Sequence, residues 1–421
     1  MKQPLPSQQS ESRRVSLWHS LLFLFTTVLF PVLAFAQAPN LVLQPATADF
    51  GFIGKGGDSA LTARVLNYNP MPATVSAGYL HSCAVAADGT VKCWGLNNYN
   101  QLGDGTTTQR STANPVADIT TAKQVASGAY HSCALLADRS VQCWGNNANG
   151  ELGDGTTTQR SKPVSVSGIN NATAISVGER FSCALLADET VKCWGRNPSG
   201  QLGDGTTTQR ITPVSVQGLT DVLSLSVGSD HACAVTRDNG AVKCWGQNAY
   251  GQLGNGTKTN SNVPVVVSGL SNAIAVSAGQ LRSCAIELGG SAKCWGNNEH
   301  GAIGDSTSTE RLTPTQVTGL TSGVTVIDTG RRHTCAVVNG GAKCWGYNAY
   351  GVVGDGTTTG RNAPVDVSGL TSGISDIDVE SFADASHTCA TTTAGGIKCW
   401  GYNDYNQLGD GTATQRTAPV E

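Results

Sequence analysis

Short apolar segments alternate with glycine-rich polar turns along most of this chain, and the alternation itself repeats. Each copy has an apolar segment such as residues 174–177, a segment around a His-Ser-Cys-Ala motif, and a Cys-Trp-Gly segment. A further Pro-Val segment, such as Pro213 to Leu219, lies upstream of these three. Apolar runs of this length bounded by turn residues are typical of strands. Each copy therefore predicts about four short strands.

The copies recur at a nearly constant period. The first cysteines are separated by steps of 50, 50, 50, 51, 51 and 54 residues, and they are Cys83, Cys133, Cys183, Cys233, Cys284, Cys335 and Cys389. Self-similarity at this period indicates supersecondary units that bury their apolar faces by stacking on their neighbours. Four strands in about fifty residues, repeated in this way, predict an all-β, seven-bladed β-propeller over residues 73–421.

Both faces of the central hairpin in each copy are apolar. Strand alternation places Cys83, Val91 and Cys93 on one face, and Ala84 and Trp94 on the other. A sheet that is apolar on both faces is expected where sheets stack face against face. The pattern therefore supports blades rather than a sheet with one solvated face.

The spacing of the two cysteines in each copy predicts the turn between them. A separation of 10 residues places them opposite each other across a three-residue loop such as Ala87 to Gly89. The copy with a separation of 9 has the two-residue turn Asn339-Gly340, which favours type I′. The copy with a separation of 11 has four residues, 237–240. The turn absorbs each change of length, so the cysteines stay opposed.

Opposed cysteines predict one disulfide in each blade. Their Cα atoms are expected about 4.5 to 5.5 Å apart, within the range that a disulfide tolerates. The alternative, metal binding by thiolates, lacks any Cys-x-x-Cys spacing. The expected pairs are Cys83 with Cys93, Cys133 with Cys143, Cys183 with Cys193, Cys233 with Cys244, Cys284 with Cys294, Cys335 with Cys344, and Cys389 with Cys399.

Composition narrows the class of protein further. The 421 residues include 51 glycines, only 14% are charged, and the formal net charge is −3. So small a net charge gives no strong field toward nucleic acid or an anionic membrane. We therefore expect neither as a partner.

The first 72 residues precede the repeats. Residues 1–36 resemble a bacterial signal peptide, with Arg13 and Arg14 before an apolar run and small residues at Ala34 and Ala36. We expect a secreted, periplasmic or cell-surface protein, with a retained membrane anchor as the alternative. Residues 37–72 contain short β-rich stretches that resemble the start of an immunoglobulin-like domain. That segment is too short for a sandwich, so a fragment, a spacer and extra strands on the first blade all stay open.

The repeat resembles that of the regulator of chromosome condensation family. The resemblance rests on Trp194-Gly195-Arg196-Asn197 followed by Gly200-Gln201-Leu202-Gly203, with Gly178 and Ser182-Cys183-Ala184 upstream, and it covers every copy from about Thr74. The resemblance implies a propeller. Members of the family include a nuclear exchange factor for the GTPase Ran and an exported bacterial propeller that inhibits β-lactamases. The cysteine pairs and the Asp-Gly-Thr sequence depart from the nuclear pattern, so no exchange-factor residue is transferred to this chain.

Two recurring polar positions are candidates for chemistry and are better explained by structure. Five copies carry a histidine two residues before the first cysteine, and recurrence at one position favours packing or hydrogen bonding; they are His81, His131, His231, His333 and His387. Six copies carry an aspartate in a Gly-Asp-x-Thr loop, such as Asp104, with an arginine such as Arg110 downstream. A calcium loop normally needs several carboxylates, so an Asx turn supported by the arginine is preferred.

The positions where the copies differ are the candidate binding residues. They follow the glycine that precedes each His-Ser-Cys motif, and equivalent loops lie on one face of a closed ring. Aromatic residues also recur in the Asn-x-x-Gly loops, at Tyr99, Tyr250, His300, Tyr350 and Tyr405. The candidate binding residues are Tyr79, Tyr130, Arg180, Asp230, Leu281, Arg331, Arg332 and Phe382.

The sequence contains no nucleophile elbow, phosphate-binding loop or zinc-protease motif. We therefore expect a monomeric, non-catalytic scaffold that binds a protein partner through these loops, without a cofactor or metal and without membrane contact after signal cleavage. A polysaccharide-active enzyme or carbohydrate-binding propeller is the alternative, because blades can assemble a site that no local motif reveals. Exchange of GTPase nucleotides and inhibition of β-lactamase rank lower.

Overall fold

The computed structural model describes residues 42–43, 65–66, 75–380 and 386–421. All of the described strands belong to one compact unit, residues 42–421. Before the repeats, β1 (Val42–Leu43) pairs antiparallel with β2 (Val65–Leu66). The expected signal peptide and most of the segment 37–72 lie outside the described residues.

Seven four-stranded antiparallel sheets follow, so the predicted all-β, seven-bladed propeller is confirmed. Blade 1 contains β3 (Val75–Ala77), β4 (His81–Val85), β5 (Val91–Gly95) and β6 (Arg110–Pro115). Blades 2 to 4 contain β7 (Ala122–Ser127), β8 (His131–Leu136), β9 (Val141–Gly145), β10 (Arg160–Ser165), β11 (Ala172–Val177), β12 (Phe181–Leu186), β13 (Val191–Gly195), β14 (Arg210–Ser215), β15 (Val222–Val227), β16 (His231–Thr236), β17 (Val242–Gly246) and β18 (Ser261–Val266). Blades 5 to 7 contain β19 (Ala273–Ala278), β20 (Arg282–Glu287), β21 (Ser291–Gly296), β22 (Arg311–Gln316), β23 (Val324–Thr329), β24 (His333–Val338), β25 (Gly341–Gly346), β26 (Arg361–Asp366), β27 (Ile374–Val379), β28 (His387–Thr392), β29 (Ile397–Gly401) and β30 (Arg416–Val420).

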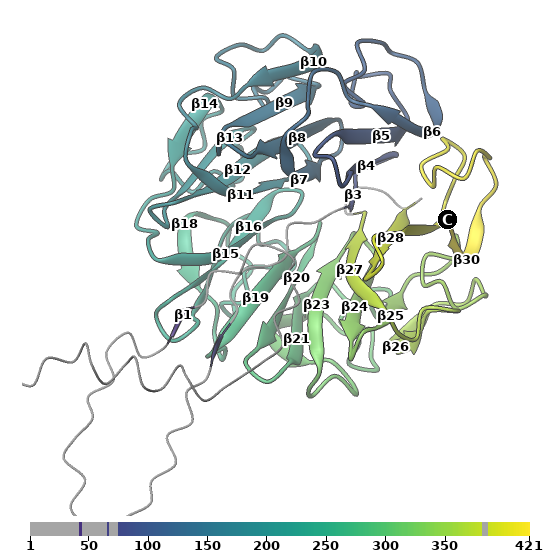
Figure 1. Cartoon of the computed structure of the whole chain (residues 1–421). Coiled ribbons are helices and arrows are strands. Elements are labelled where there is room, and N and C mark those ends of the chain that lie inside the picture. Colours follow the sequence, from purple (N-terminus) through teal and green to yellow (C-terminus); the bar gives the residue numbers. More distant parts are fainter. Residues whose placement is uncertain (1–41, 44–64, 67–74, 381–385) are drawn as a thin grey trace, which may run out of the picture. The chain divides into compact units, whose positions relative to one another are not determined.

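The strands of each blade run outward from the centre of the ring in chain order. The first strands, from β3 to β27, are gathered around the centre, and the fourth strands lie outermost (Figure 1). The outermost strands carry the most exposed positions, as in β6. The core therefore lies between neighbouring blades.

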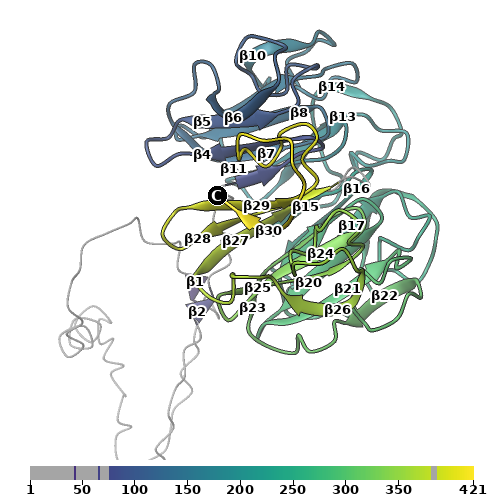
Figure 2. The same ribbon diagram turned by 90° about the vertical axis from the view of Figure 1, so that its right-hand side faces the viewer.

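The grouping of strands differs in one respect from the sequence prediction. The Pro-Val segment was expected to begin a copy, but it forms the last strand of the preceding sheet; Val214 of β14 pairs with Cys193 of β13. Likewise, Val420 of β30 pairs with Cys399 of β29 and completes the last sheet (Figure 2). The first and last blades are thus each built from consecutive strands, so side chains rather than a shared strand must close the ring.

All seven predicted disulfides are present, one in each blade. The two cysteines are directly opposed in every hairpin, as Cys83 and Cys93 are. Their Cα atoms lie 4.0–4.1 Å apart, closer than the expected range. The Ala86 N–H donates to the Thr90 carbonyl oxygen, and alternation from that bonded pair makes the cysteines a pair without hydrogen bonds, where strands approach most closely.

The predicted turns are confirmed as well. Gly89 adopts φ 81° at the last position of the three-residue loop. Asn339 and Gly340 have φ values of 51° and 81°, as a type I′ turn requires. In blades 2 and 3 the position of Gly89 is taken by Arg139 and Glu189, with φ values of 67° and 61°. A side chain in this left-handed region is strained, so these two turns store a small conformational cost.

A buried tryptophan joins each blade to the one before it. Trp245 packs with the Cys183–Cys193 disulfide of the preceding blade, and its indole N–H donates to the Gln201 carbonyl oxygen at 2.9 Å. The same contact closes the ring, because Trp94 donates to the Gln407 carbonyl oxygen at 2.8 Å. Its equivalents in the other blades are Trp144, Trp194, Trp295, Trp345 and Trp400, all fully buried.

The recurring histidines also join blades, which confirms their structural role. His131 Nε2 lies 2.8 Å from the Ser182 hydroxyl of the next blade, and that hydroxyl donates to the Glu151 carbonyl oxygen. The hydroxyl therefore accepts from the Nε2 hydrogen, and Nδ1 is buried without a hydrogen-bond partner in the described part of the chain. Burial lowers the pKa of all five histidines to about 3. All five histidines are therefore uncharged at neutral pH, and each connects two neighbouring blades.

One junction replaces the histidine and its partner together. Blade 3 has Phe181 at the histidine position, and the residue opposite it in blade 4 is Ala232 rather than a serine or threonine. Both residues are fully buried. Loss of the donor is thus matched by loss of the hydroxyl, which leaves no unpaired hydroxyl at that junction.

A belt of polar side chains surrounds the centre of the ring. Ser76 Oγ accepts the Ser127 N–H of the next blade at 3.0 Å, and four of the other blades repeat this contact from Ser176, Ser226, Ser277 and Asp328. Asp378 Oδ1 accepts the Ala77 N–H at 2.9 Å and so closes the belt between the last and first blades. Blade 2 has an alanine here, and Gln124 bonds to Ile175 of blade 3 instead. Every neighbouring pair of inner strands is therefore bridged.

Candidate binding face

Two sets of loops emerge on one face of the ring. Because antiparallel strands alternate in direction, the turn after the first strand and the loop after the third strand lie at the same end of each sheet. In blade 1 these are residues 78–80 and 96–109. We call these two segments and their equivalents in the other blades the loop face.

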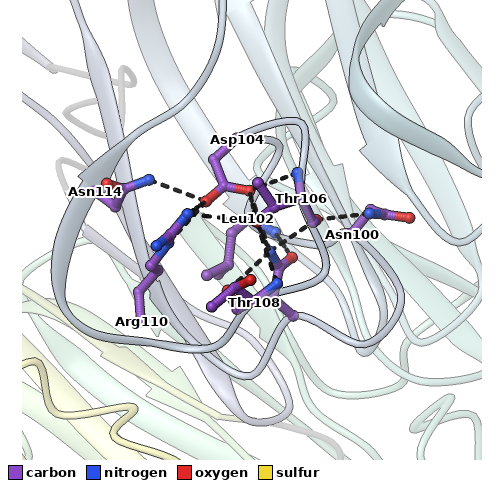
Figure 3. A network of polar contacts seen from close by, with 8 residues as sticks. Asn100, Leu102, Asp104, Thr106, Thr108, Arg110 and Asn114 are labelled. Carbon is purple, nitrogen blue, oxygen red and sulfur yellow. Dashed lines mark hydrogen bonds and ion pairs between the residues drawn. The ribbon is translucent and has the colours of Figure 1, made fainter.

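An aspartate holds the long loop of six blades in a fixed shape. Asp104 Oδ1 accepts the Thr106 N–H at 2.9 Å and its hydroxyl at 2.7 Å, which is the predicted Asx turn (Figure 3). Arg110 donates to Asp104 Oδ2 at 2.6 Å from Nη2 and 2.8 Å from Nε. Asn97 supports the same loop by donating to the Thr106 and Thr108 carbonyl oxygens.

The aspartate and the arginine are present or absent together. Six blades carry the pair, as in Asp204 with Arg210, whereas blade 4 has Asn255 and Ser261. Asn255 still accepts from Thr257, so the turn persists without charge. In the other six blades the aspartate–arginine pair therefore stabilises the loop.

Three candidate binding residues meet on blades 1 to 3. The rings of Tyr79 and Tyr130 are 5.5 Å apart, and Tyr99 lies 5.0 Å from Tyr130. The Arg180 guanidinium lies 5.9 Å from the centre of the Tyr130 ring. Arg180 also forms an ion pair with Glu179. We call Tyr79, Tyr99, Tyr130 and Arg180 the tyrosine patch.

Asp230 of blade 4 is held beside that patch by polar contacts. Its Oδ1 accepts from Arg196 and from Gln201, both at 2.7 Å. Burial raises the pKa of Asp230 to about 6, although Arg196 opposes the shift. The group therefore titrates near neutral pH.

Blades 5 to 7 carry a second run of aromatic rings. His300 lies 5.0 Å from Tyr347, Tyr347 lies 6.3 Å from Tyr350, and Tyr350 lies 5.2 Å from Tyr402. Tyr402 in turn lies 6.4 Å from Tyr405. We call these five residues the aromatic arc. Their contacts cross two blade junctions.

The remaining candidate binding residues are scattered. Arg332 lies 5.4 Å from the centre of the Tyr347 ring and so joins the aromatic arc. Leu281 and Arg331 lie in the equivalent turns of blades 5 and 6, each half-buried. Phe382 falls outside the described residues.

Sequence reasoning missed three residues of this face. Arg196, Tyr347 and Tyr402 occupy the position directly after Trp-Gly, where the seven blades carry five different residue types. This variation is visible in the repeat and could have identified the position. Leu96, Asn146, Gln247 and Asn297 occupy it in the other blades.

The described residues contain no group of three or more histidine, cysteine, aspartate or glutamate side chains placed to hold a metal ion. Within the same ranges, no helix is long and apolar enough to cross a membrane.

Comparison with known proteins decides the family. The model of the regulator of chromosome condensation (RCC1) repeat matches residues 88–135, 140–185, 189–235, 239–286 and 290–337, and a second RCC1 repeat model matches residues 73–101, 122–151, 172–201 and 222–252. The chain belongs to the RCC1 repeat family. The resemblance noted in the sequence is therefore confirmed.

Solved structures agree with this RCC1-repeat fold. Human WBSCR16 is 22% identical with a TM-score of 0.67, over 79% of this chain and 93% of that one. Prp20p from Saccharomyces cerevisiae is 21% identical with a TM-score of 0.64, over 75% of this chain and 83% of that one. The yeast protein is described with binding properties toward Gsp1p and histones. At these identities the likeness shows the fold alone.

Proposed function

We propose that this RCC1-repeat propeller is an exported, non-catalytic scaffold that binds a protein partner through the loop face. The observation that carries the proposal is the tyrosine patch, where Tyr79, Tyr99, Tyr130 and Arg180 come together from three blades. Tyrosine and arginine, together with tryptophan, are enriched among the residues that anchor protein interfaces. Three of the residues that differ between otherwise similar blades, Tyr79, Tyr130 and Arg180, thus lie together in one patch.

The rigidity of the loops supports the proposal. The Asp104 network holds the loop that presents Tyr99, and Tyr99 N–H donates to the Gln101 side chain at 2.8 Å. A surface that is already ordered loses less conformational entropy on binding. The loop face is therefore suited to binding without rearrangement.

The family supports a protein as the first ligand class to test, because its member Prp20p is described with protein partners. Export is proposed from the resemblance of residues 1–36 to a signal peptide. Disulfides in every blade are in keeping with an oxidising compartment.

A capture experiment tests the proposal. Full-length mature protein is immobilised and exposed to solubilised cell-surface proteins, beside a Tyr79→Ala/Tyr130→Ala/Arg180→Ala variant. The matched control is Tyr250→Ala, because Tyr250 is an exposed loop-face tyrosine of blade 4 outside the tyrosine patch.

We expect a specific partner to be captured by the wild type and by the control, and to be lost with the triple variant. Equal recovery on the triple variant would remove the tyrosine patch as the binding surface. Circular dichroism and non-reducing electrophoresis verify that each variant is folded.

A further inference from the structure

We propose that a cleft between blades 5 and 6 is a binding site for a neutral saccharide. The cleft has a volume of about 400 Å³ and lies on the loop face, between the loops that carry His300 and Tyr347. Small-molecule sites in proteins occupy roughly 300–1,000 Å³. The site is distinct from the tyrosine patch, so it goes beyond the proposed protein-binding function.

A single glycine opens this cleft. Gly360 precedes the arginine of the Asp–Arg pair, and the other six blades have a larger polar residue at that position: Gln109, Gln159, Gln209, Asn260, Glu310 and Gln415. Three of these side chains reach the preceding blade. Gln109 donates to Asn406 at 2.5 Å, Gln159 donates to Asn100, and Glu310 pairs with Lys258 at 2.5 Å. Gly360 has no side chain to occupy the equivalent space.

The lining of the cleft combines aromatic rings with polar groups. The His300 and Tyr347 rings pack against each other, with centres 5.0 Å apart and planes inclined by 53°, and both line the cleft. Glu299, Asn362 and Ser308 add a carboxylate, an amide and a hydroxyl. Sugars present apolar C–H faces that pack on rings and hydroxyls that bond to planar polar groups, so this combination suits a sugar ring.

The charges around the cleft favour a neutral ligand. No lysine or arginine is among the described residues that line it, and Glu299 disfavours an anionic ligand. The Arg332 guanidinium already lies over the Tyr347 ring, 5.4 Å from its centre. Its positive charge next to that ring also disfavours a cationic ligand, for which a free aromatic face would be the usual receptor.

The aromatic arc extends the site along the ring. From Tyr347 the ring contacts continue through Tyr350 and Tyr402 to Tyr405. A longer saccharide could therefore gain contacts beyond the cleft. The equivalent positions of blade 3 are Arg196 and Ser199, so the repeat does not dictate these aromatics.

Binding of defined oligosaccharides to the full mature chain tests the proposal. The probes are cello-, malto- and chito-oligosaccharides of two and four sugars at millimolar concentration, with tetragalacturonate as the anionic comparison. Saturation-transfer NMR detects binding, and calorimetry measures affinity. We expect at least one neutral series to bind, the tetramer more tightly than the dimer, and no binding of tetragalacturonate.

Three variants locate the site. Gly360→Gln installs the residue that four other blades carry. Gly360 lies outside the left-handed region, and a Cβ there would meet only the Gly346 carbonyl oxygen, at 3.3 Å. We expect this variant to fold and to lose binding. Tyr347→Ala should weaken affinity by about tenfold, since an aromatic contact is worth up to ~1.5 kcal/mol. Tyr250→Ala should bind as the wild type does.

Absence of binding by every neutral series would overturn the proposal, as would undiminished binding to folded Gly360→Gln. Loss of a captured protein partner from Gly360→Gln, with no saccharide bound by the wild type, would assign the cleft to that protein instead. None of these results tests the role of Tyr79, Tyr130 and Arg180. The saccharide proposal and the protein-binding proposal can therefore fail independently.

Discussion

The buried histidines predict that the propeller is destabilised by mild acid. Each has a pKa of about 3 in the folded state, below its ordinary value of 6.5, because burial disfavours the charged ring. The unfolded chain therefore binds more protons than the folded chain between these pH values, and stability falls as pH falls through that window. Above pH 6.5 the histidines impose no such cost.

The magnitude follows from linkage. Each pH unit inside the window costs about 1.36 kcal/mol per histidine, so lowering the pH from 6.5 to 5 costs ~2 kcal/mol for each group. Five equivalent histidines would then lower the free energy of unfolding by about 10 kcal/mol in total. The buried carboxyl groups Asp328 and Asp378 oppose part of this loss, because burial raises their pKa values.

The junction of blades 3 and 4 supplies the matched substitution. We would replace His131 by phenylalanine and Ser182 by alanine, which reproduces the pair Phe181 and Ala232 found one junction further on. His131→Phe alone leaves the Ser182 oxygen without its donor and should cost about 1–3 kcal/mol. Adding Ser182→Ala should recover part of that cost.

Urea unfolding at pH 7 and pH 5, with disulfides intact, measures the effect. Between these two pH values the double variant should lose about 2 kcal/mol less than the wild type, since one titrating group has been removed. An identical pH dependence in both proteins would refute the assignment of acid lability to these histidines. A folded, disulfide-bonded double variant at pH 7 is the necessary control.

Three further outcomes follow from the scaffold. Arg139→Gly should raise the free energy of unfolding by about 0.5–1 kcal/mol in urea unfolding, because Arg139 has φ 67° where blade 1 uses Gly89; a loss of stability would contradict the turn geometry. Asp104→Asn should destabilise the protein more than the double variant Asp104→Asn/Arg110→Ser, because the double variant leaves no unpaired arginine. Blade 4 carries the same combination as Asn255 and Ser261, and thermal unfolding measures which variant is less stable. Asp378→Ser should make stability rise more steeply between pH 5 and pH 8 than it does in the wild type, because a carboxyl with a raised pKa loses its stabilising effect on ionisation and so opposes the rise. An unchanged pH profile would exclude Asp378.

The fold could be predicted from the sequence because the information is local and repeated seven times. The cysteine separations of 9, 10 and 11 residues specify the turns, and the observed turns at Gly89, Asn339 and Gly340 match them. The assignment of the Pro-Val strands to blades was wrong because an outer strand can pair with the sheet before it or after it, and spacing does not distinguish the two. Only the ladder between β13 and β14 decides it.

The loop face was predicted less completely, since it depends on contacts between blades. Tyr79 and Tyr130 were identified from their variation, and the structure brings them within 5.5 Å. Tyr347 and Tyr402 were missed because they adjoin the uniform Trp-Gly motif. The cleft at Gly360 could not be found from one copy of the repeat. It arises because Gly360 lacks the side chain that other blades extend toward the blade before them.

The central claim is that the loop face is the binding surface, and a hydrogen-exchange footprint of the protein with its captured, purified partner tests it most directly. The account predicts slowed exchange in residues 78–80, 96–109 and 128–130, and unchanged exchange in the opposite turns such as residues 86–90. Protection confined to those opposite turns would contradict it.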